Sequence, residues 1–205
     1  MKKIIYVGLL VAVAFACEKP KEKALPILGR HDYNENDTVY HTIDDFKFIN
    51  QDSNRVSQQT VEGKVYVADF FFTSCPTICP IMKTQMLRVY EQIQDNDDVL
   101  ILSHTIDPKH DTVAVLKEFA DRLGVSSEKW HFVTGEKEDI YKIGQTSYMV
   151  SAVEDPTEPG GFIHSGAFIL VDDQRRVRGI YDGTKQDQVD RLIRDLDILL
   201  KEINS

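Results

Sequence analysis

The sequence has few cysteines, no excess of basic residues, no internal repeat and no hydrophobic run long enough for a comfortable membrane-spanning helix. Three cysteines in 205 residues cannot form the disulfide framework of a small secreted domain. Acidic side chains outnumber basic ones by 33 to 24, which argues against nucleic acid as a partner. The chain is long enough for one domain with a full hydrophobic core.

The first residues follow the pattern of a bacterial lipoprotein signal. Lys2 and Lys3 precede an uncharged apolar run over 4–16, and small residues stand close to Cys17. A basic start, a short apolar core and small residues before a cleavage point are typical of secretory signals. The cysteine at that point resembles a lipobox, so we expect a signal peptide over 1–16 and lipid on Cys17. The alternatives are an ordinary signal peptide and an uncleaved anchor. Each interpretation places the rest of the chain in an extracytoplasmic space, and the lipobox anchors it to a bacterial cell membrane.

The remaining chain divides into a predicted tether and one predicted domain. Residues 17–37 are charged and turn-prone, which is typical of a linker, whereas 38–205 alternate between strand and helix patterns. This alternation predicts an α/β fold. We expect strands at 39–43, 46–49, 65–72, 99–105, 131–134, 163–171 and 177–181, and helices at 80–94, 112–123, 136–143 and 189–200.

Two cysteines follow the strand predicted at 65–72, in the sequence Cys-Pro-Thr-Ile-Cys-Pro at 75–80. Proline disfavours helical conformation in the preceding residue, so both cysteines should lie in a turn, with a helix beginning near Pro80. The amides and the dipole at that helix end would favour the thiolate of Cys79, the form that binds metals and attacks disulfides. The alternatives are two buried structural thiols or a permanent disulfide.

Three further segments complete a recognisable set. They are Thr-Ile-Asp-Pro-Lys-His-Asp-Thr at 105–112, Trp-His-Phe-Val-Thr-Gly at 130–135 and Ile-His-Ser-Gly-Ala-Phe-Ile-Leu-Val-Asp at 163–172. Together with the cysteine motif and the order of elements, they resemble the Sco/SenC family over roughly residues 38–203. The resemblance implies a thioredoxin-like fold, with a central mixed sheet flanked by helices. It also implies a membrane-tethered, copper-binding protein that assists assembly of the binuclear copper centre of cytochrome c oxidase.

By this resemblance, Cys75, Cys79 and His164 bind one copper ion per domain, as Cu(I) or Cu(II), and Asp107 is a candidate accessory group. Two thiolates and an imidazole suit Cu(I), which prefers soft ligands, whereas structural zinc would need a fourth protein ligand. Taken alone, a histidine on a strand is more often structural than a ligand, and Asp107 could equally serve in a turn. His110 stands where the family commonly has arginine, so an ion pair of that arginine is in question.

Two functions are consistent with these residues. The first is a metallochaperone that passes copper to the copper-centre subunit of the oxidase. The second is a thiol-disulfide oxidoreductase that uses Cys75 and Cys79 as a redox-active disulfide to reduce a partner's cysteines. The spacing favours the first, because dedicated reductases have a tighter Cys-x-x-Cys pair and do not need a distant histidine.

Overall fold

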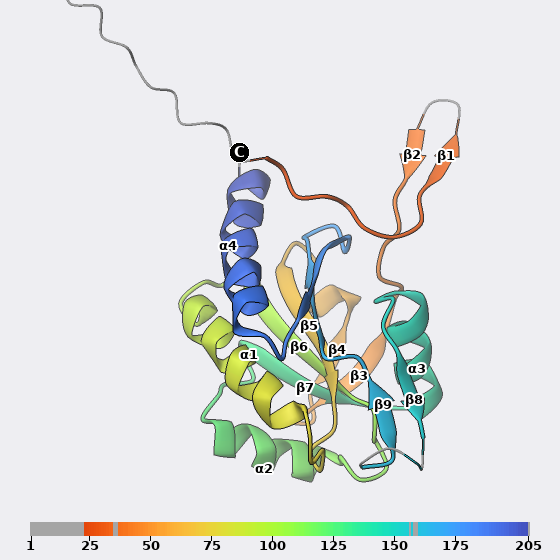
Figure 1. Cartoon of the computed structure of the whole chain (residues 1–205), viewed down its shortest axis with the longest axis vertical. Coiled ribbons are helices and arrows are strands. Elements are labelled where there is room, and N and C mark those ends of the chain that lie inside the picture. Colours follow the sequence, from red (N-terminus) through yellow and green to blue (C-terminus); the bar gives the residue numbers. More distant parts are fainter. Residues whose placement is uncertain (1–22, 35–36, 156, 158–159, 205) are drawn as a thin grey trace, which may run out of the picture.

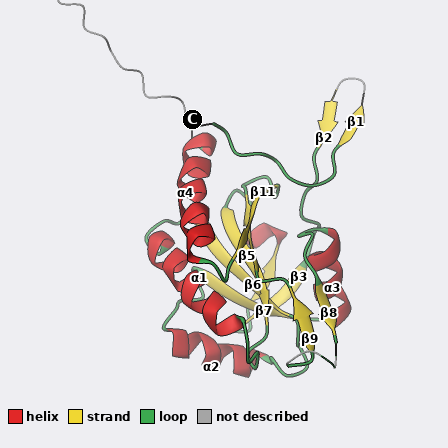
Figure 2. Ribbon diagram, in the orientation of Figure 1, coloured by secondary structure: helices red, strands yellow, loops and turns green. Residues whose placement is uncertain are grey.

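The computed structural model describes residues 23–34, 37–155, 157 and 160–204, with only the backbone for Ala152, Val153, Ile163 and His164. A seven-stranded sheet lies at its centre, in the order β11-β10-β5-β6-β7-β3-β4 (Figures 1 and 2). The strands are β3 (Lys47–Asn50), β4 (Arg55–Ser57), β5 (Val65–Phe71), β6 (Val99–Thr105), β7 (Trp130–Thr134), β10 (Ala167–Val171) and β11 (Val177–Asp182).

The sheet is mixed and covered by helices. Strands β5, β6 and β7 are parallel, whereas β10, β11, β3 and β4 join the sheet antiparallel. A 3-10 turn, η1 (Gln58–Thr60), follows β4. Figure 1 shows α1 and α4 together on one side of the sheet and α3 on the other. The helices are α1 (Cys79–Ile93), α2 (Val113–Leu123), α3 (Lys137–Thr146) and α4 (Gln186–Ile203). This is the predicted α/β architecture.

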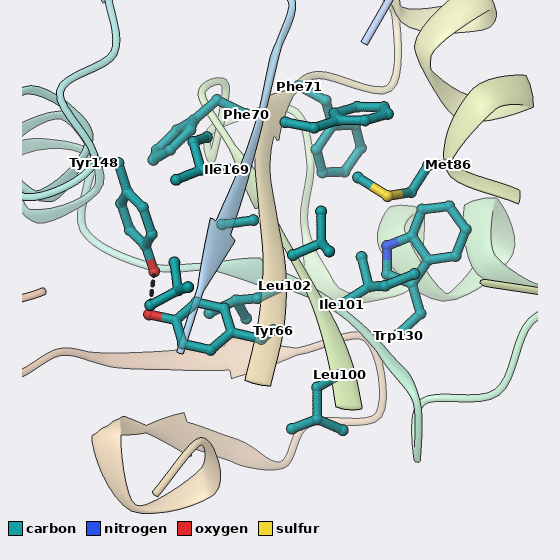
Figure 3. Packing of buried hydrophobic residues seen from close by; sticks show 14 of the residues in the cluster. Tyr66, Phe70, Phe71, Met86, Leu100, Ile101, Leu102, Trp130, Tyr148 and Ile169 are labelled. Carbon is teal, nitrogen blue, oxygen red and sulfur yellow. Dashed lines mark hydrogen bonds between the residues drawn. The ribbon is translucent and has the colours of Figure 1, made fainter. Parts of the chain in front are cut away.

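Strands β5 and β6 form the middle of the core, since every residue of both is buried. Figure 3 shows side chains on both faces of these strands. Phe71 and Trp130 pack with Met86 of α1 on one face, and Tyr66 lies with Tyr148 on the other, their hydroxyls 3.3 Å apart. Each large apolar side chain buried in this way contributes roughly 1.5–3 kcal/mol. The nearly continuous apolar pattern at 65–72 therefore predicted this central strand correctly.

The helix boundaries follow from local signals. Proline at the second position of α1 has no amide hydrogen to lose there, as the sequence predicted. Thr112 caps α2 by accepting a hydrogen bond from the Val115 amide at 3.5 Å. The same helix ends at Gly124, whose φ of 70° is the left-handed conformation that glycine adopts without strain.

The first predicted strand differs from the structure. Residues 40–43 are not in a strand, and the Ile43 amide instead donates to the carbonyl of Arg175 at 2.9 Å. The strands here are β1 (Asp32–Asn34) and β2 (Asp37–Val39), which form a small antiparallel hairpin away from the main sheet (Figure 1). The residues of these short strands are largely exposed, so they lack the apolar alternation that would predict them.

The chain before this hairpin is fastened to the domain. The Arg178 guanidinium, almost fully buried, donates to the carbonyls of Leu25 and Pro26 and to the carboxylate of Glu202 at the end of α4. The Leu28 amide also donates to a carbonyl of β11 at 2.7 Å. The division into a tether over 17–37 and a domain over 38–205 stays a prediction. Residues 1–22, with the predicted signal peptide and Cys17, lie outside the described residues.

The strand predicted at 163–171 is two strands. Strand β9 (Phe162–His164) pairs with β8 (Ala152–Glu154) in a separate hairpin, and the main sheet resumes at β10. The break falls at Ser165 and Gly166. A side chain at Gly166 would begin 3.2 Å from the Thr184 methyl group, so the chain passes too close to its neighbours there to take a larger residue without a shift.

Across the described residues, no helix has the length and apolar character needed to span a bilayer.

His104 is fully buried on the α3 side of β6. Its ring stacks on Phe70, with 4.8 Å between centroids, and meets Phe48 edge-on at 5.5 Å. Burial in these aromatic surroundings lowers the pKa of His104 from 6.5 to about 4, although the charge of Asp69 opposes the shift. This position favours a neutral packing role for His104.

We predict that His104 contributes to acid sensitivity. Its folded-state pKa lies below the unfolded value of 6.5, so the unfolded state takes up the proton first. The contribution is complete above pH 6.5 and is lost as the pH falls towards 4, by up to about 3 kcal/mol. Replacing His104→Phe should reduce this dependence, as measured by urea unfolding across that range. His131, whose pKa burial also lowers to about 4, should contribute in the same direction. An unchanged pH dependence in His104→Phe would contradict the assignment.

Candidate metal centre

The two cysteines of the motif lie together where β5 ends and α1 begins. Cys75 sits in the turn, with its amide donating to the Phe72 carbonyl at 3.3 Å, and Cys79 is the first residue of α1. Both side chains are thiols rather than a disulfide, and only 8% of Cys75 and 4% of Cys79 is exposed. The sequence therefore predicted the turn and the helix start correctly.

The N-terminal end of α1 favours the thiolate of Cys75 rather than that of Cys79. Burial raises the pKa of Cys75, but hydrogen bonds from the amides of Thr77 and Cys79, the Cys79 thiol and the Thr77 hydroxyl together bring that pKa below the ordinary thiol value. The Thr77 hydroxyl oxygen lies 3.6 Å from the Cys75 sulfur. The first amide of α1 thus points at the earlier cysteine, which becomes the better thiolate of the pair.

Cys79 has the opposite character, and the sequence-based expectation for its thiolate was wrong. Burial raises the pKa of Cys79 well above the ordinary thiol value. A hydrogen bond from the Phe72 amide and the positive charge of Lys83 act in the other direction, while the hydrogen bond to Cys75 raises the pKa further. The position of Cys79 at a helix N-terminus did not decide its pKa, because the side chain of the first helical residue is buried in the protein and loses its contact with water.

A hydrogen-bonded cluster holds the start of this turn. The Asp111 carboxylate, fully buried, accepts from the amide and hydroxyl of Thr73 and from the hydroxyl of Thr105. His110 Nδ1 lies 3.0 Å from the same carboxylate, and this hydrogen bond raises the pKa of His110. His110 therefore makes an ion pair at the position where the family commonly has arginine. Asp111 thus ties the end of β5 to the loop after β6.

The β8–β9 hairpin backs onto the cysteine turn. The rings of Phe162 and Phe72 lie 4.9 Å apart. A side chain at Gly160 would begin 3.1 Å from the ring of Pro76, and one at Gly166 would begin 3.5 Å from Ile78. The backbone of His164 runs between these contacts, at the end of β9. Its imidazole lies outside the described part of the structure.

Asp107 lies in the turn after β6. Its carbonyl accepts from the amides of His110 and Asp111 at 3.1 and 2.8 Å, and its own amide donates to the Thr105 hydroxyl at 3.0 Å. These bonds are those of a turn residue, the alternative left open for Asp107. Among the side chains that are described, no group of three or more His, Cys, Asp and Glu residues could hold a metal. Met82 and Met86 are fully buried in the core.

A cavity of about 230 Å³ opens beside the thiols, between α1 and α2. Both cysteines line it, together with apolar side chains that include Phe72, Leu87 and Phe119. The polar residues Thr73, Thr84 and Lys83 also line it. The thiols are thus reached through a largely apolar opening, in which a soft ligand is favoured over a hydrated one.

Lys83 and Asp69 are the residues at this site that sequence reasoning missed. Their side chains are 5% and 0% exposed, and the ammonium lies 2.6 Å from the carboxylate. The sequence did contain a signal. Asp69 interrupts an otherwise apolar strand, and Lys83 stands one position after Met82 on the buried side of the following helix. Charged residues in such positions are almost never buried unless they are paired.

Comparison with known proteins gives the family. The family model described as SCO1/SenC matches residues 34–201. The SCO1 protein homolog of Bacillus subtilis is 33% identical over 162 residues, which cover 78% of this chain and 83% of that protein.

Solved structures of that family resemble this chain. A SCO1/SenC family lipoprotein from Bacillus anthracis is 31% identical, with a TM-score of 0.71 over 78% of this chain and 95% of the other. BsSco, described as having a disulfide switch and as a member of the Sco family of cytochrome c oxidase assembly proteins, is 33% identical, with a TM-score of 0.68 over 78% and 93%. The copper-bound ScoI of Bradyrhizobium japonicum, 24% identical, has the same fold, with a TM-score of 0.64 over 77% and 99%. This chain, with its thioredoxin-like α/β fold, belongs to the SCO1/SenC family.

Proposed function

We propose that this protein is a membrane-tethered copper metallochaperone that delivers copper to the binuclear centre of cytochrome c oxidase. One observation carries the proposal. Cys75 and Cys79 lie in hydrogen-bonding contact in a buried turn that opens into a cavity, in a chain of the SCO1/SenC family. Copper is the cargo, and the oxidase subunit that carries the copper centre is the recipient.

The donor set fits copper better than other metals. Two sulfur ligands four positions apart, with an imidazole as the third ligand, satisfy Cu(I), which accepts low coordination numbers. Structural zinc would need a fourth ligand, and no other described His, Cys, Asp or Glu joins the cysteines to provide one. A site with three ligands also leaves a position for a ligand of the recipient, as transfer requires.

His164 is proposed as the third ligand. The support is the contact of its neighbours with the cysteine turn: Phe162 packs on the strand end, and Gly166 lies against the residue between the cysteines. The backbone of His164 is therefore within the part of the chain that borders the cysteine turn. Asp107 remains a candidate accessory group, although its hydrogen bonds are those of a turn.

Thiol-disulfide exchange is the second candidate, and the asymmetry of the two thiols favours it. Cys75 has a lowered pKa and Cys79 a raised one, as expected for an attacking and a resolving thiol. The Cys75 thiolate would attack a partner's disulfide and release one partner thiolate. Cys79 would then close the Cys75–Cys79 disulfide and release the second. The pair is oxidised by two electrons, the partner is reduced by two, and the two thiol protons end on the partner.

The membrane attachment rests on the N-terminal pattern. A basic start, an apolar run and Cys17 are arranged as in lipoproteins, and the related Bacillus anthracis protein is a lipoprotein. Lipid on Cys17 would place the domain on the extracytoplasmic side of a bacterial membrane.

The full chain, purified in detergent, should bind one copper ion. Replacing Cys75→Ser, Cys79→Ser or His164→Ala should weaken binding by more than about a hundredfold, because loss of a ligand exceeds the effect of losing an outer partner. Competition with a chromophoric chelator and the Cu(II) absorption spectrum measure this. Binding should also weaken as pH falls, since protons compete for the thiolates and the imidazole.

His31→Ala is the matched control, because His31 immediately precedes β1, outside the proposed ligand set and outside the cluster that holds the cysteine turn. It should keep the affinity and the spectrum of the wild type. If His164→Ala behaves like this control, His164 is not a ligand.

Oxidase activity measured in cells that carry the variants distinguishes copper delivery from thiol exchange. In copper-limited medium, His164→Ala should abolish oxidase activity although both thiols remain, because two sulfur ligands alone hold copper poorly. Added copper should restore activity in part by mass action. A protein that acts only as a reductase tolerates His164→Ala but not Cys75→Ser. Normal oxidase assembly in the His164→Ala strain, together with failed assembly in the Cys75→Ser strain, would therefore reject the copper function.

Cys17 should carry lipid. The wild type should take up labelled fatty acid and sediment with membranes, whereas Cys17→Ser should be released or remain unprocessed. Cys75→Ser controls for loss of a thiol elsewhere and should be labelled normally. Failure of the wild type to incorporate label would contradict the assignment.

A further inference from the structure

The ion pair of Lys83 and Asp69 lies directly beneath the cysteine turn. Asp69 is on β5, six residues before Cys75, and Lys83 is one helical turn after Cys79. The second carboxylate oxygen of Asp69 accepts from the Ser103 hydroxyl, which itself accepts from the Trp130 indole N–H at 2.8 Å. A buried ion pair of this kind is weak support for stability, because well-packed apolar residues often do as well. The presence of this ion pair therefore suggests a role other than stability.

The positive partner of the pair acts on the thiol site, since the charge of Lys83 lowers the pKa of Cys79. Lys83 lines the cavity that contains both cysteines, whereas Asp69 does not. The ammonium also lies 4.1 Å from the centroid of the Phe71 ring and is surrounded by the buried aromatic side chains of β7. The Ser103 hydroxyl bonds to both partners, since it donates to the Asp69 carboxylate and accepts from the Lys83 ammonium at 3.4 Å. The cavity is therefore polarised by a fixed cation that water screens little.

The charge of a copper site depends on the oxidation state of the metal. Cu(I) with two thiolates and a neutral imidazole carries one net negative charge, whereas Cu(II) with the same ligands is neutral. Burial disfavours the charged complex unless an opposite charge compensates it. A cation in the wall of the cavity therefore stabilises Cu(I) more than Cu(II).

We propose that Lys83 is a positioning residue that makes this site prefer Cu(I) over Cu(II). The inference rests on the proposed copper function and on Cys75, Cys79 and His164 as ligands. The Lys83 ammonium does not bind the metal. Asp69 holds it in place, and the Lys83 side chain lines the same cavity as the thiols, where the ammonium offsets the negative charge of the Cu(I) complex.

The test compares Lys83→Met with wild type as full chains in detergent. We expect the Kd for Cu(I) to rise on the order of tenfold, while the Kd for Cu(II) changes much less. A tenfold difference corresponds to a copper reduction potential about 59 mV lower for this one-electron couple. Chelator competition measures both affinities, and a redox titration followed by the Cu(II) spectrum measures the potential.

Two variants separate charge from structure. Lys83→Arg keeps a cation and should restore the preference. Ser103→Ala breaks the same buried network but leaves both charges, so it should keep the wild-type ratio of affinities. If Lys83→Met unfolds because Asp69 is left unpaired, the double variant Lys83→Met/Asp69→Asn removes that buried charge and should still show the lower potential.

The outcomes distinguish this inference from the proposed function. Copper binding by the wild type, with an unchanged ratio of Cu(I) to Cu(II) affinity in Lys83→Met or its double variant, overturns the role of Lys83 only. Equal weakening of both oxidation states in Lys83→Met and Ser103→Ala also overturns it, because a structural role has that effect. Absence of copper binding by the wild type overturns the proposed function itself.

Discussion

The hydrogen bond from the first amide of α1 to the sulfur of Cys75 is the interaction on which the site depends. It forms because Pro76 disfavours helical conformation at Cys75, so the chain turns before α1 begins at Cys79. Asp111 fixes the start of this turn by accepting two hydrogen bonds from Thr73. The buried ends of β5 and β6 therefore hold a loop that would otherwise be mobile.

This geometry makes the two thiols unequal although their sequence surroundings are nearly the same. Cys75 receives hydrogen bonds that favour its thiolate, while Cys79 is buried and keeps its proton. Metal binding must remove that proton, so the cost falls mainly on Cys79. A nearby cation reduces the cost, and Lys83 is the buried cation of the same cavity. The raised pKa of Cys79 and the ion pair beneath it are thus parts of one electrostatic arrangement.

The central strands and helices could be predicted from the sequence because their signals are physical and local. The apolar run at β5, the prolines at α1 and the cap at Thr112 each fix an element directly. The hairpins β1–β2 and β8–β9 could not be predicted in this way. Their strands are three residues long, and the first pair is exposed, so no apolar period marks them. The cysteine pair was found from its prolines, but the sign of the Cys79 shift depends on burial, which spacing alone does not give.

The attachment of the N-terminal segment adds a constraint on how the site meets a partner. Arg178 holds the carbonyls of Leu25 and Pro26 beside the end of α4, and Figure 1 shows the β5–α1 turn at the opposite end of the molecule. Helix α4 has 18 residues and so is about 27 Å long. If lipid is attached at Cys17, the few residues before Leu25 span at most about 28 Å, even fully extended. Under the proposed function, a domain that extends from such an anchor would present the thiols away from the bilayer, where they would meet a copper site that projects from the membrane.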